Sequence, residues 1–126
     1  MKILVIHSSN FDYKKELYEP IKKSTLSQNH TFILPFEQSS FPVMKSLIEK
    51  KEIDFILAEI AYPSTGQGIE LGWAEVFGMP VVCVCKKGKV YSGAVKIVTS
   101  EIYEYGDETE LLAHIQMIVE KRTAAL

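Results

Sequence analysis

A short stretch in the middle of the chain, PSTGQGIELGWAE (63–75), contains residues that can bind anions and attack carbon. Ser64, Gly66 and Gly68 form a turn-rich segment, and a single carboxylate, Glu70, follows between two apolar residues. Hydroxyl and backbone N–H groups at the start of a helix form a natural site for phosphate or another anion. A carboxylate fixed against a ligand can be a nucleophile toward a sugar carbon. The stretch therefore predicts an anion-binding loop beside a reactive carboxylate.

The same stretch also has a purely structural interpretation. Ser64-x-x-Gln67 has the spacing of a capping box, in which the glycines only serve the turn. With a helix expected over about 67–77, Glu70 lies in its first turn, where a glutamate balances the helix dipole. The glycine spacing fits neither the phosphate loop G-x-x-x-x-G-K-[ST] nor the dinucleotide fingerprint G-x-G-x-x-G. The loop alone leaves both interpretations open.

Further candidate residues follow the first apolar run of the chain. His7 stands at its end, where it either touches a ligand or is a satisfied structural histidine. Tyr13 and Phe11 can stack on a nucleobase, or they pack the first helix. Ser9 lies in the same polar segment, HSSN (7–10).

Composition bounds the class of protein. The 126 residues suit one domain, 1–126, with a single core, and 47% apolar with 24% charged residues is typical of a globular protein. A formal charge of −2 gives no electrostatic case for nucleic acid or an anionic membrane as a partner. No apolar run approaches the roughly 20 residues that span a bilayer, and MKILVIHSSN is too short for a signal peptide.

The two cysteines, Cys83 and Cys85, are two residues apart and point to the same side of an expected strand. Nothing else on the chain supplies metal-ligand spacing. We interpret them as reduced core thiols, and we expect a cytoplasmic protein with no metal and no cofactor.

Apolar runs and amphipathic segments alternate along the chain. Strands are expected at 2–7, 30–36, 53–60, 79–85 and 101–105, and helices after Asp12 with a kink or restart at Pro20, around 43–48, over 67–77, and from about 111 to 119. This alternation predicts a three-layer, Rossmann- or flavodoxin-like α/β fold with a parallel sheet of about five strands. Ligands bind beyond the carboxyl ends of such strands, where HSSN, the loop after Phe36, AYPSTGQG (61–68) and KKGKVYSG (86–93) fall.

The segment PSTGQGIELGWAEVFGMPVVCV resembles the signature of the nucleoside 2-deoxyribosyltransferase superfamily, and within it the branch of 2'-deoxynucleoside 5'-phosphate N-hydrolases. The pattern of that branch is roughly A-E-V-x-x-P-S-x-G-x-G-x-E-L-G-x-A, a short spacer, and K-P-[IVL]-[IVL]-C. The matching positions are Ala58-Glu59-Ile60, Pro63-Ser64, Gly66, Gly68, Glu70-Leu71-Gly72, Ala74 and Pro80. Tyr91-Ser92-Gly93-Ala94-Val95 resembles a second family segment of the form L-S-A-M-I.

The resemblance implies a role for each matching residue. Glu70 matches the glutamate that attacks the anomeric carbon of 2-deoxyribose and forms a glycosyl-enzyme, which water or a second base then resolves. Ser64 and Gly66 match the loop that holds the 5' end of the sugar, including a 5'-phosphate. Ser92 matches a serine that reaches the neighbouring subunit's site, so a homodimer or larger homo-oligomer is implied. Ser9 falls near a phosphate-contacting serine.

The chain departs from the pattern of this branch at two places. G-S-I-R-G after the first strand is replaced by HSSNF (7–11), which lacks the arginine, so Lys14 or Lys15 would have to supply its charge. An acidic residue in the helix before the third strand would fall near Ser46, and Glu49 is almost a turn away. Release of a base needs protonation or hydrogen bonding of that base. The two differences in sequence leave this step without an assigned acid.

Three functions are therefore considered. The first is an N-glycosidase that cleaves the base–sugar bond of 2'-deoxynucleoside 5'-monophosphates, or transfers the deoxyribosyl group, through Glu70. The second is a nucleotide-binding module of the same fold without catalysis. The third is a hydrolase of another N-ribosyl bond, such as that of a ribonucleotide or dinucleotide. In each the partner is a nucleotide or nucleoside, and the substrate-binding residues expected are Ser9, Tyr13, Ser64, Gly66, Gly68 and Ser92.

Overall fold

The computed structural model describes residues 1–126, apart from the side chain of Gln38. Five strands form one parallel sheet in the order β2-β1-β3-β4-β5. This is the flavodoxin-like strand order, so the expected α/β fold is confirmed. The strands are β1 (Lys2–Ile6), β2 (Thr31–Ile33), β3 (Phe55–Glu59), β4 (Val81–Lys86) and β5 (Ile102–Tyr105).

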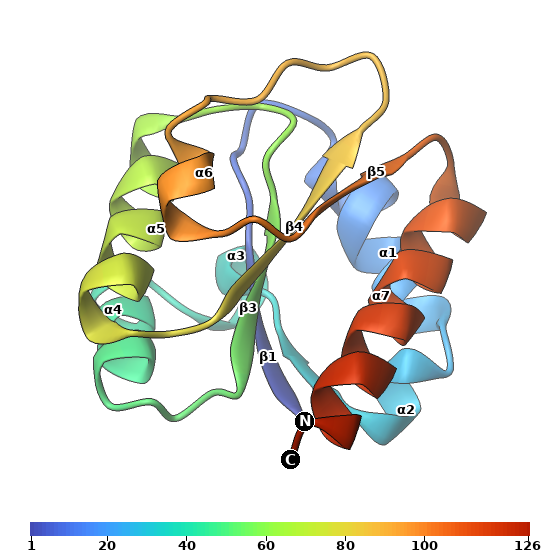
Figure 1. Ribbon diagram of the computed structural model, residues 1–126. Helices are drawn as coiled ribbons and strands as arrows, with labels where there is room; N and C mark the ends of the chain where they lie inside the picture. Colours follow the sequence, from blue (N-terminus) through green and yellow to red (C-terminus); the bar gives the residue numbers. More distant parts are fainter.

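Helices cover both faces of the sheet (Figure 1). One face packs against α1 (Glu19–Lys23), α2 (Leu26–Asn29) and α7 (Glu108–Ala124), and the other against α4 (Phe41–Glu49), α5 (Thr65–Phe77) and α6 (Val95–Val98). Alternate residues of β1 enter opposite cores: Ile3 and Val5 face the first layer, Leu4 and Ile6 the second. Because both faces of β1 are buried, every residue along it from Ile3 to Ile6 is apolar.

Proline placement sets several boundaries. Pro20 stands near the start of α1, directly after a π-helical turn η1 (Lys14–Tyr18), so the predicted restart is confirmed. The second strand is shorter than predicted, because Pro35 opens a helical turn, α3 (Pro35–Gln38). The segment before β5 also contains a short helix, α6, that its mixed sequence did not predict.

The helix that carries Glu70 begins two residues earlier than predicted. α5 starts at Thr65 because the Ser64 side chain caps it, so Gly66 and Gly68 are helical. Glu70 therefore lies in the second turn, and the expectation that it balances the helix dipole in the first turn is wrong.

Within the described part of the chain, none of the helices has the length and apolar character needed to cross a bilayer.

Candidate active site

The candidate site lies at the carboxyl edge of the sheet, where β1 and β3 are neighbours although β2 separates them in the chain. The chain leaves β1 and β3 toward opposite faces of the sheet, which makes this place the topological switch point of the fold. Ligands of such folds bind at the switch point. A cavity of about 520 Å³ opens there. We call it the Glu70 cavity. It is lined by His7, Ser8, Ser9, Tyr13, Phe36, Phe41, Ser64, Gly66, Gln67 and Glu70.

Glu70 is the carboxylate of this cavity and is only 4% exposed. Among the described residues, no hydrogen bond or ion pair reaches its carboxyl group. Burial raises its pKa to about 7, because the charged form loses water without gaining a partner. A buried acid without a partner costs folding free energy, and such groups cluster at functional sites.

Ser64 makes half of the predicted capping box. Its hydroxyl accepts a hydrogen bond from the Gln67 backbone N–H at 3.3 Å, and its carbonyl accepts from Gly68 N–H at 3.1 Å. The Gln67 side chain does not return to Ser64; its Nε2 donates to the Glu59 carbonyl at 2.5 Å. The amides of Gln67 and Gly68, predicted to bind an anion, are therefore already occupied within the cap.

His7 is buried and contributes its ring to the cavity wall. Its Nδ1 lies 2.7 Å from the Ser8 carbonyl and its Nε2 lies 2.5 Å from the Tyr18 hydroxyl. A carbonyl only accepts, so Nδ1 carries the proton and Nε2 accepts from Tyr18. Burial lowers the His7 pKa and outweighs the Ser8 hydrogen bond, so the ring is neutral. His7 is thus both a satisfied structural histidine and part of the cavity wall.

Aromatic rings form one side of the Glu70 cavity. The ring centroids of Tyr13 and Phe36 are 5.0 Å apart, and each lies 4.8 Å from that of His7. Phe36 and Phe41 also line the cavity while being 45% and 47% exposed. Phe11 stacks on Tyr62 instead, at 4.5 Å. The sequence placed the loop after Phe36 at the binding edge, but it did not single out the rings of Phe36 and Phe41 as part of the site.

One glycine at the start of α5 has a steric reason. A Cβ added at Gly66 would lie 3.0 Å from Phe41 Cζ, whereas one added at Gly68 or Gly72 meets nothing within 4 Å. Gly66 therefore lets the Phe41 ring approach the helix start beside the cavity.

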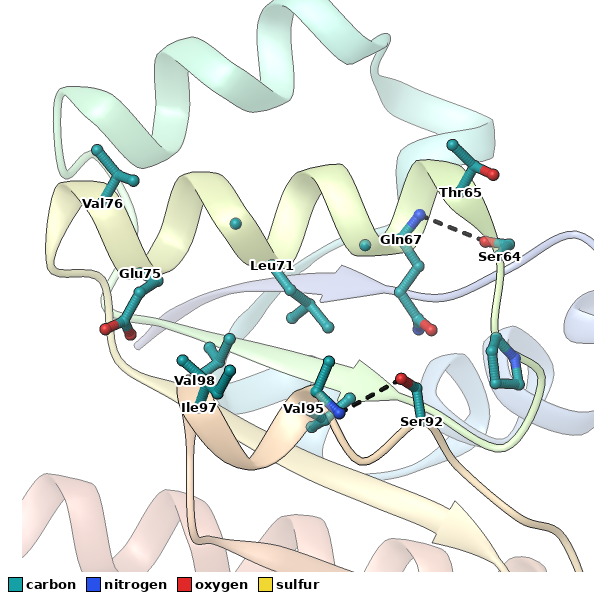
Figure 2. A pocket seen from close by; sticks show the side chains of 14 residues that line it. Ser64, Thr65, Gln67, Leu71, Glu75, Val76, Ser92, Val95, Ile97 and Val98 are labelled. Carbon is teal, nitrogen blue, oxygen red and sulfur yellow. Dashed lines mark hydrogen bonds between the residues drawn. The ribbon is translucent and has the colours of Figure 1, made fainter.

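The seven residues expected from sequence separate into two places. Glu70, Ser9, Tyr13, Ser64 and Gly66 line the Glu70 cavity, whereas Gly68 and Ser92 line a second hollow on the other side of α5. This α5–α6 groove, of about 750 Å³, runs between α5 and α6 (Figure 2). Ser64 and Gln67 line both, so the groove begins where the cavity ends.

A second buried carboxyl, Glu59, supports the start of the loop that connects β3 to α5. It accepts hydrogen bonds from Ala61 N–H at 2.5 Å and from the Tyr105 hydroxyl. Burial raises its pKa to about 7, against these two hydrogen bonds, which lower it. Glu59 does not line the Glu70 cavity, so we assign it a positioning contact between β3, β5 and the loop to Ser64.

Cys83 and Cys85 are buried free thiols, and burial raises the pKa of Cys85 to about 11. The described residues contain no group of three or more His, Cys, Asp or Glu side chains that could hold a metal ion.

Comparison with curated proteins gives relatives that share one name. No family model matches the chain. It is similar to 5-hydroxymethyl-dUMP N-hydrolase of Rattus norvegicus, with 27% identity over 84 residues, 60% of this chain and 52% of the relative. The protein of the same name from Mus musculus is 30% identical over 71 residues, 51% of this chain and 41% of the relative. The chain spans about half the length of these curated relatives.

Solved structures share the fold at low identity. The CMP N-glycosidase BcmB of Clostridium botulinum has a TM-score of 0.65 at 20% identity, covering 92% of this chain and 99% of its own. A 2-deoxyribosyltransferase of Bacillus psychrosaccharolyticus has a TM-score of 0.57 at 18% identity, and the match covers 88% of this chain and 90% of that structure. A signal receiver domain of Vibrio parahaemolyticus has a TM-score of 0.62 at 14% identity, and the match covers 98% of this chain and 93% of that structure. Proteins with different functions thus share this fold, so the fold alone does not decide function.

The resemblance to the nucleoside 2-deoxyribosyltransferase superfamily is confirmed.

Where the chain departs from that superfamily's pattern, the fold supplies no substitute within one copy. Lys15 lines a separate hollow with Glu16 and Lys86, whose charged groups are 2.6 Å apart. Neither Lys14 nor Lys15 is among the residues of the Glu70 cavity, and neither are Ser46 and Glu49. In the described part of the chain, the cavity wall therefore holds one carboxyl and no lysine or arginine.

Proposed function

We propose that the chain is an N-glycosidase that cleaves the base–sugar bond of 2'-deoxynucleoside 5'-monophosphates, with Glu70 as the nucleophile. The observation that carries this proposal is the buried Glu70 carboxyl, which lines a cavity at the switch point of the sheet and meets no partner of its own. Similarity to N-hydrolases, an N-glycosidase and a deoxyribosyl transferase supports the same general reaction.

The reaction has two steps in this proposal. A Glu70 carboxylate oxygen attacks C1' of the sugar and the base departs, leaving a glycosyl-enzyme ester. Water, or a second base, then attacks C1' and releases the carboxylate. The pKa of about 7 leaves a large fraction of Glu70 ionised near neutral pH, and burial keeps the carboxylate poorly solvated and reactive.

The 5'-phosphate is assigned to the start of α5. Ser9, Ser64 and Gly66 line the cavity there, and no acidic residue stands in the first turn of the helix. The positive end of a helix favours an anion at this point. Because Ser64 already occupies the amides of Gln67 and Gly68, we assign the phosphate contacts to the hydroxyls of Ser9 and Ser64.

A second copy of the chain is proposed to cover the α5–α6 groove. Val76 and Ile97 line it while being 79% and 76% exposed. Trp73 and Phe77, which are also apolar and lie on α5, are half-buried against the chain's own core. Closed two-fold interfaces are the commonest way to bury such a surface. Because the groove adjoins the cavity at Ser64, Ser92 of one copy can reach the phosphate end of the other.

Base release tests the proposal. We expect wild-type protein to release free base from 2'-deoxynucleoside 5'-monophosphates, and Glu70→Gln to lower kcat by at least about 1,000-fold while the circular dichroism spectrum is kept. Glu49→Gln, the same change on an exposed glutamate of α4, should retain wild-type kcat. Ribonucleotides measured beside deoxynucleotides separate the deoxyribosyl activity from hydrolysis of another N-ribosyl bond. Turnover by Glu70→Gln at the wild-type rate would remove the assignment.

A further inference from the structure

The Glu70 cavity has an unusual charge content for a site that releases a nucleobase. Its wall holds three ionisable side chains, His7, Tyr13 and Glu70, in the described part of the chain. His7 is neutral and both its ring nitrogens are engaged, by the Ser8 carbonyl and the Tyr18 hydroxyl. Once Glu70 ionises, the wall carries a negative charge that no lysine or arginine of the wall offsets.

Three rings stand beside that charge. Tyr13, Phe36 and Phe41 line the same cavity, and Phe36 and Phe41 keep almost half of their surface exposed. The faces of such rings attract flat cations, and a buried carboxylate attracts them more strongly because it is shielded from water. The combination of rings and one carboxylate suits a planar ligand with positive charge better than a neutral one.

The chemistry of the leaving group points the same way. A neutral base leaves with the electron pair of the C1'–N bond and needs a proton to avoid departing as an anion. On this wall the only carboxyl is the nucleophile, and the one His7 proton, on Nδ1, is held by the Ser8 carbonyl. Among the described residues that line the cavity, the Tyr13 hydroxyl is the one remaining ionisable group, and no second carboxyl, lysine or arginine stands ready to protonate the base.

We propose that the Glu70 cavity acts on nucleotides whose base carries a fixed positive charge, such as a pyridinium ring joined to the sugar through its nitrogen. The inference rests on the proposed function and names its substrate class. Glu70 forms a bond to C1' while the C1'–N bond breaks, and the electron pair of that bond neutralises the ring nitrogen. The base leaves as a neutral molecule without any proton transfer. Water then attacks C1', frees the Glu70 carboxylate and gives its proton to solvent.

The two ends of the substrate match two ends of the cavity. Glu70 lies five positions after Thr65 at the helix start, which is about 7.5 Å along the axis at 1.5 Å per residue. The 5'-phosphate at the positive end of α5 and a cationic base near Glu70 therefore each meet the opposite charge.

A matched pair of ligands tests the inference. The 2'-deoxyribonucleotide of nicotinamide carries a positive pyridinium, and its reduced dihydropyridine form has nearly the same shape without the charge. We expect wild-type protein to bind the oxidised form at least tenfold more tightly by calorimetry, and Glu70→Gln to reduce this ratio toward one. Glu49→Gln, remote from the cavity wall, should keep the wild-type ratio. We also expect kcat/KM for the oxidised form to exceed that for dCMP by at least 100-fold.

The outcomes separate this inference from the proposed function. Equal affinity for the oxidised and reduced forms would overturn the inference, whether or not any base is released. Faster release of base from dCMP than from the nicotinamide nucleotide would also overturn it and leave the proposed function standing. Tight, Glu70-dependent binding of the cation without release from any nucleotide would support the cation preference and remove the glycosidase proposal.

Discussion

At the scale of single residues, Glu70 combines burial, which costs stability, with the chemical role that we propose for it. Its residue type and neighbours were readable from the sequence, whereas its burial and its lack of a partner were not. The burial of Glu70 and its lack of a partner depend on residues just after β1 and in α3 and α4 that lie beside α5. The rings of Phe36 and Phe41 are among them and come from segments distant in the chain. The sequence pattern therefore singled out the carboxylate that we propose as the nucleophile, but not the cavity wall that surrounds it.

The first prediction concerns pH and rate. Burial raises the pKa of Glu70 to about 7, and only the ionised form attacks C1'. We expect kcat/KM to rise about tenfold per pH unit well below 7 and to level off above it. Glu59 has a pKa in the same range, so the profile should be repeated with Tyr105→Phe, which removes a hydrogen bond from Glu59 only. If the pH at which kcat/KM levels off shifts in the Tyr105→Phe variant, the titration belongs to Glu59.

The second prediction concerns pH and stability. The unfolded chain releases the Glu70 proton near pH 4.5, but the folded chain keeps it until about pH 7. The folded state thus binds more protons between these values, and the free energy of unfolding falls as pH rises through this window. Glu70→Gln removes this effect. Urea unfolding should show the variant more stable than wild type by about 2 to 3 kcal/mol at pH 8, and similar to it at pH 4.5. Equal stability at both pH values would contradict the burial of an unpaired charge.

At the scale of elements, the sheet and its long helices followed from the sequence because the buried strands are apolar runs and the long helices are amphipathic. Short pieces did not: the turns α3 and α6 contain four residues each, too few to display a period. The start of α5 was also placed too late, because two glycines in a row of turn residues resemble a loop until the Ser64 cap is seen.

The third prediction compares two glycines of α5. Gly68→Ala should stabilise the chain by about 0.5 to 1 kcal/mol, since alanine is the better helix former and its Cβ meets nothing within 4 Å. Gly66→Ala places a Cβ 3.0 Å from Phe41 Cζ and must displace that ring. We expect little or no gain in stability from Gly66→Ala, and a KM increase of at least threefold because Phe41 lines the cavity. Thermal unfolding and initial rates give both quantities. Identical behaviour of the two variants would argue against the contact between Gly66 and Phe41.

At the scale of the whole molecule, the sequence predicted that one edge of the sheet would carry the site, and the structure brings β1, β3 and α5 together there. It did not reveal that α5 divides the expected residues, with Ser92 on the side of the α5–α6 groove. A motif gives order along the chain but not the face of a helix against which a distant segment lies. Within one copy Ser92 shares the groove with Ser64 but is not among the residues that line the cavity, and we propose that it acts at the cavity of a second copy.

The last prediction tests that second copy. Val76 and Ile97 line the groove with most of their surface exposed, so Val76→Lys or Ile97→Lys should weaken self-association at least tenfold in sedimentation experiments at micromolar concentration. Val90→Lys is the matched control, because Val90 is also highly exposed but does not line the groove. If Ser92 completes a site across the interface, mixing Glu70→Ala with Ser92→Ala protein should restore activity, since one hybrid site keeps both intact residues. Activity that stays full in a monomeric variant would show instead that each copy holds a complete site.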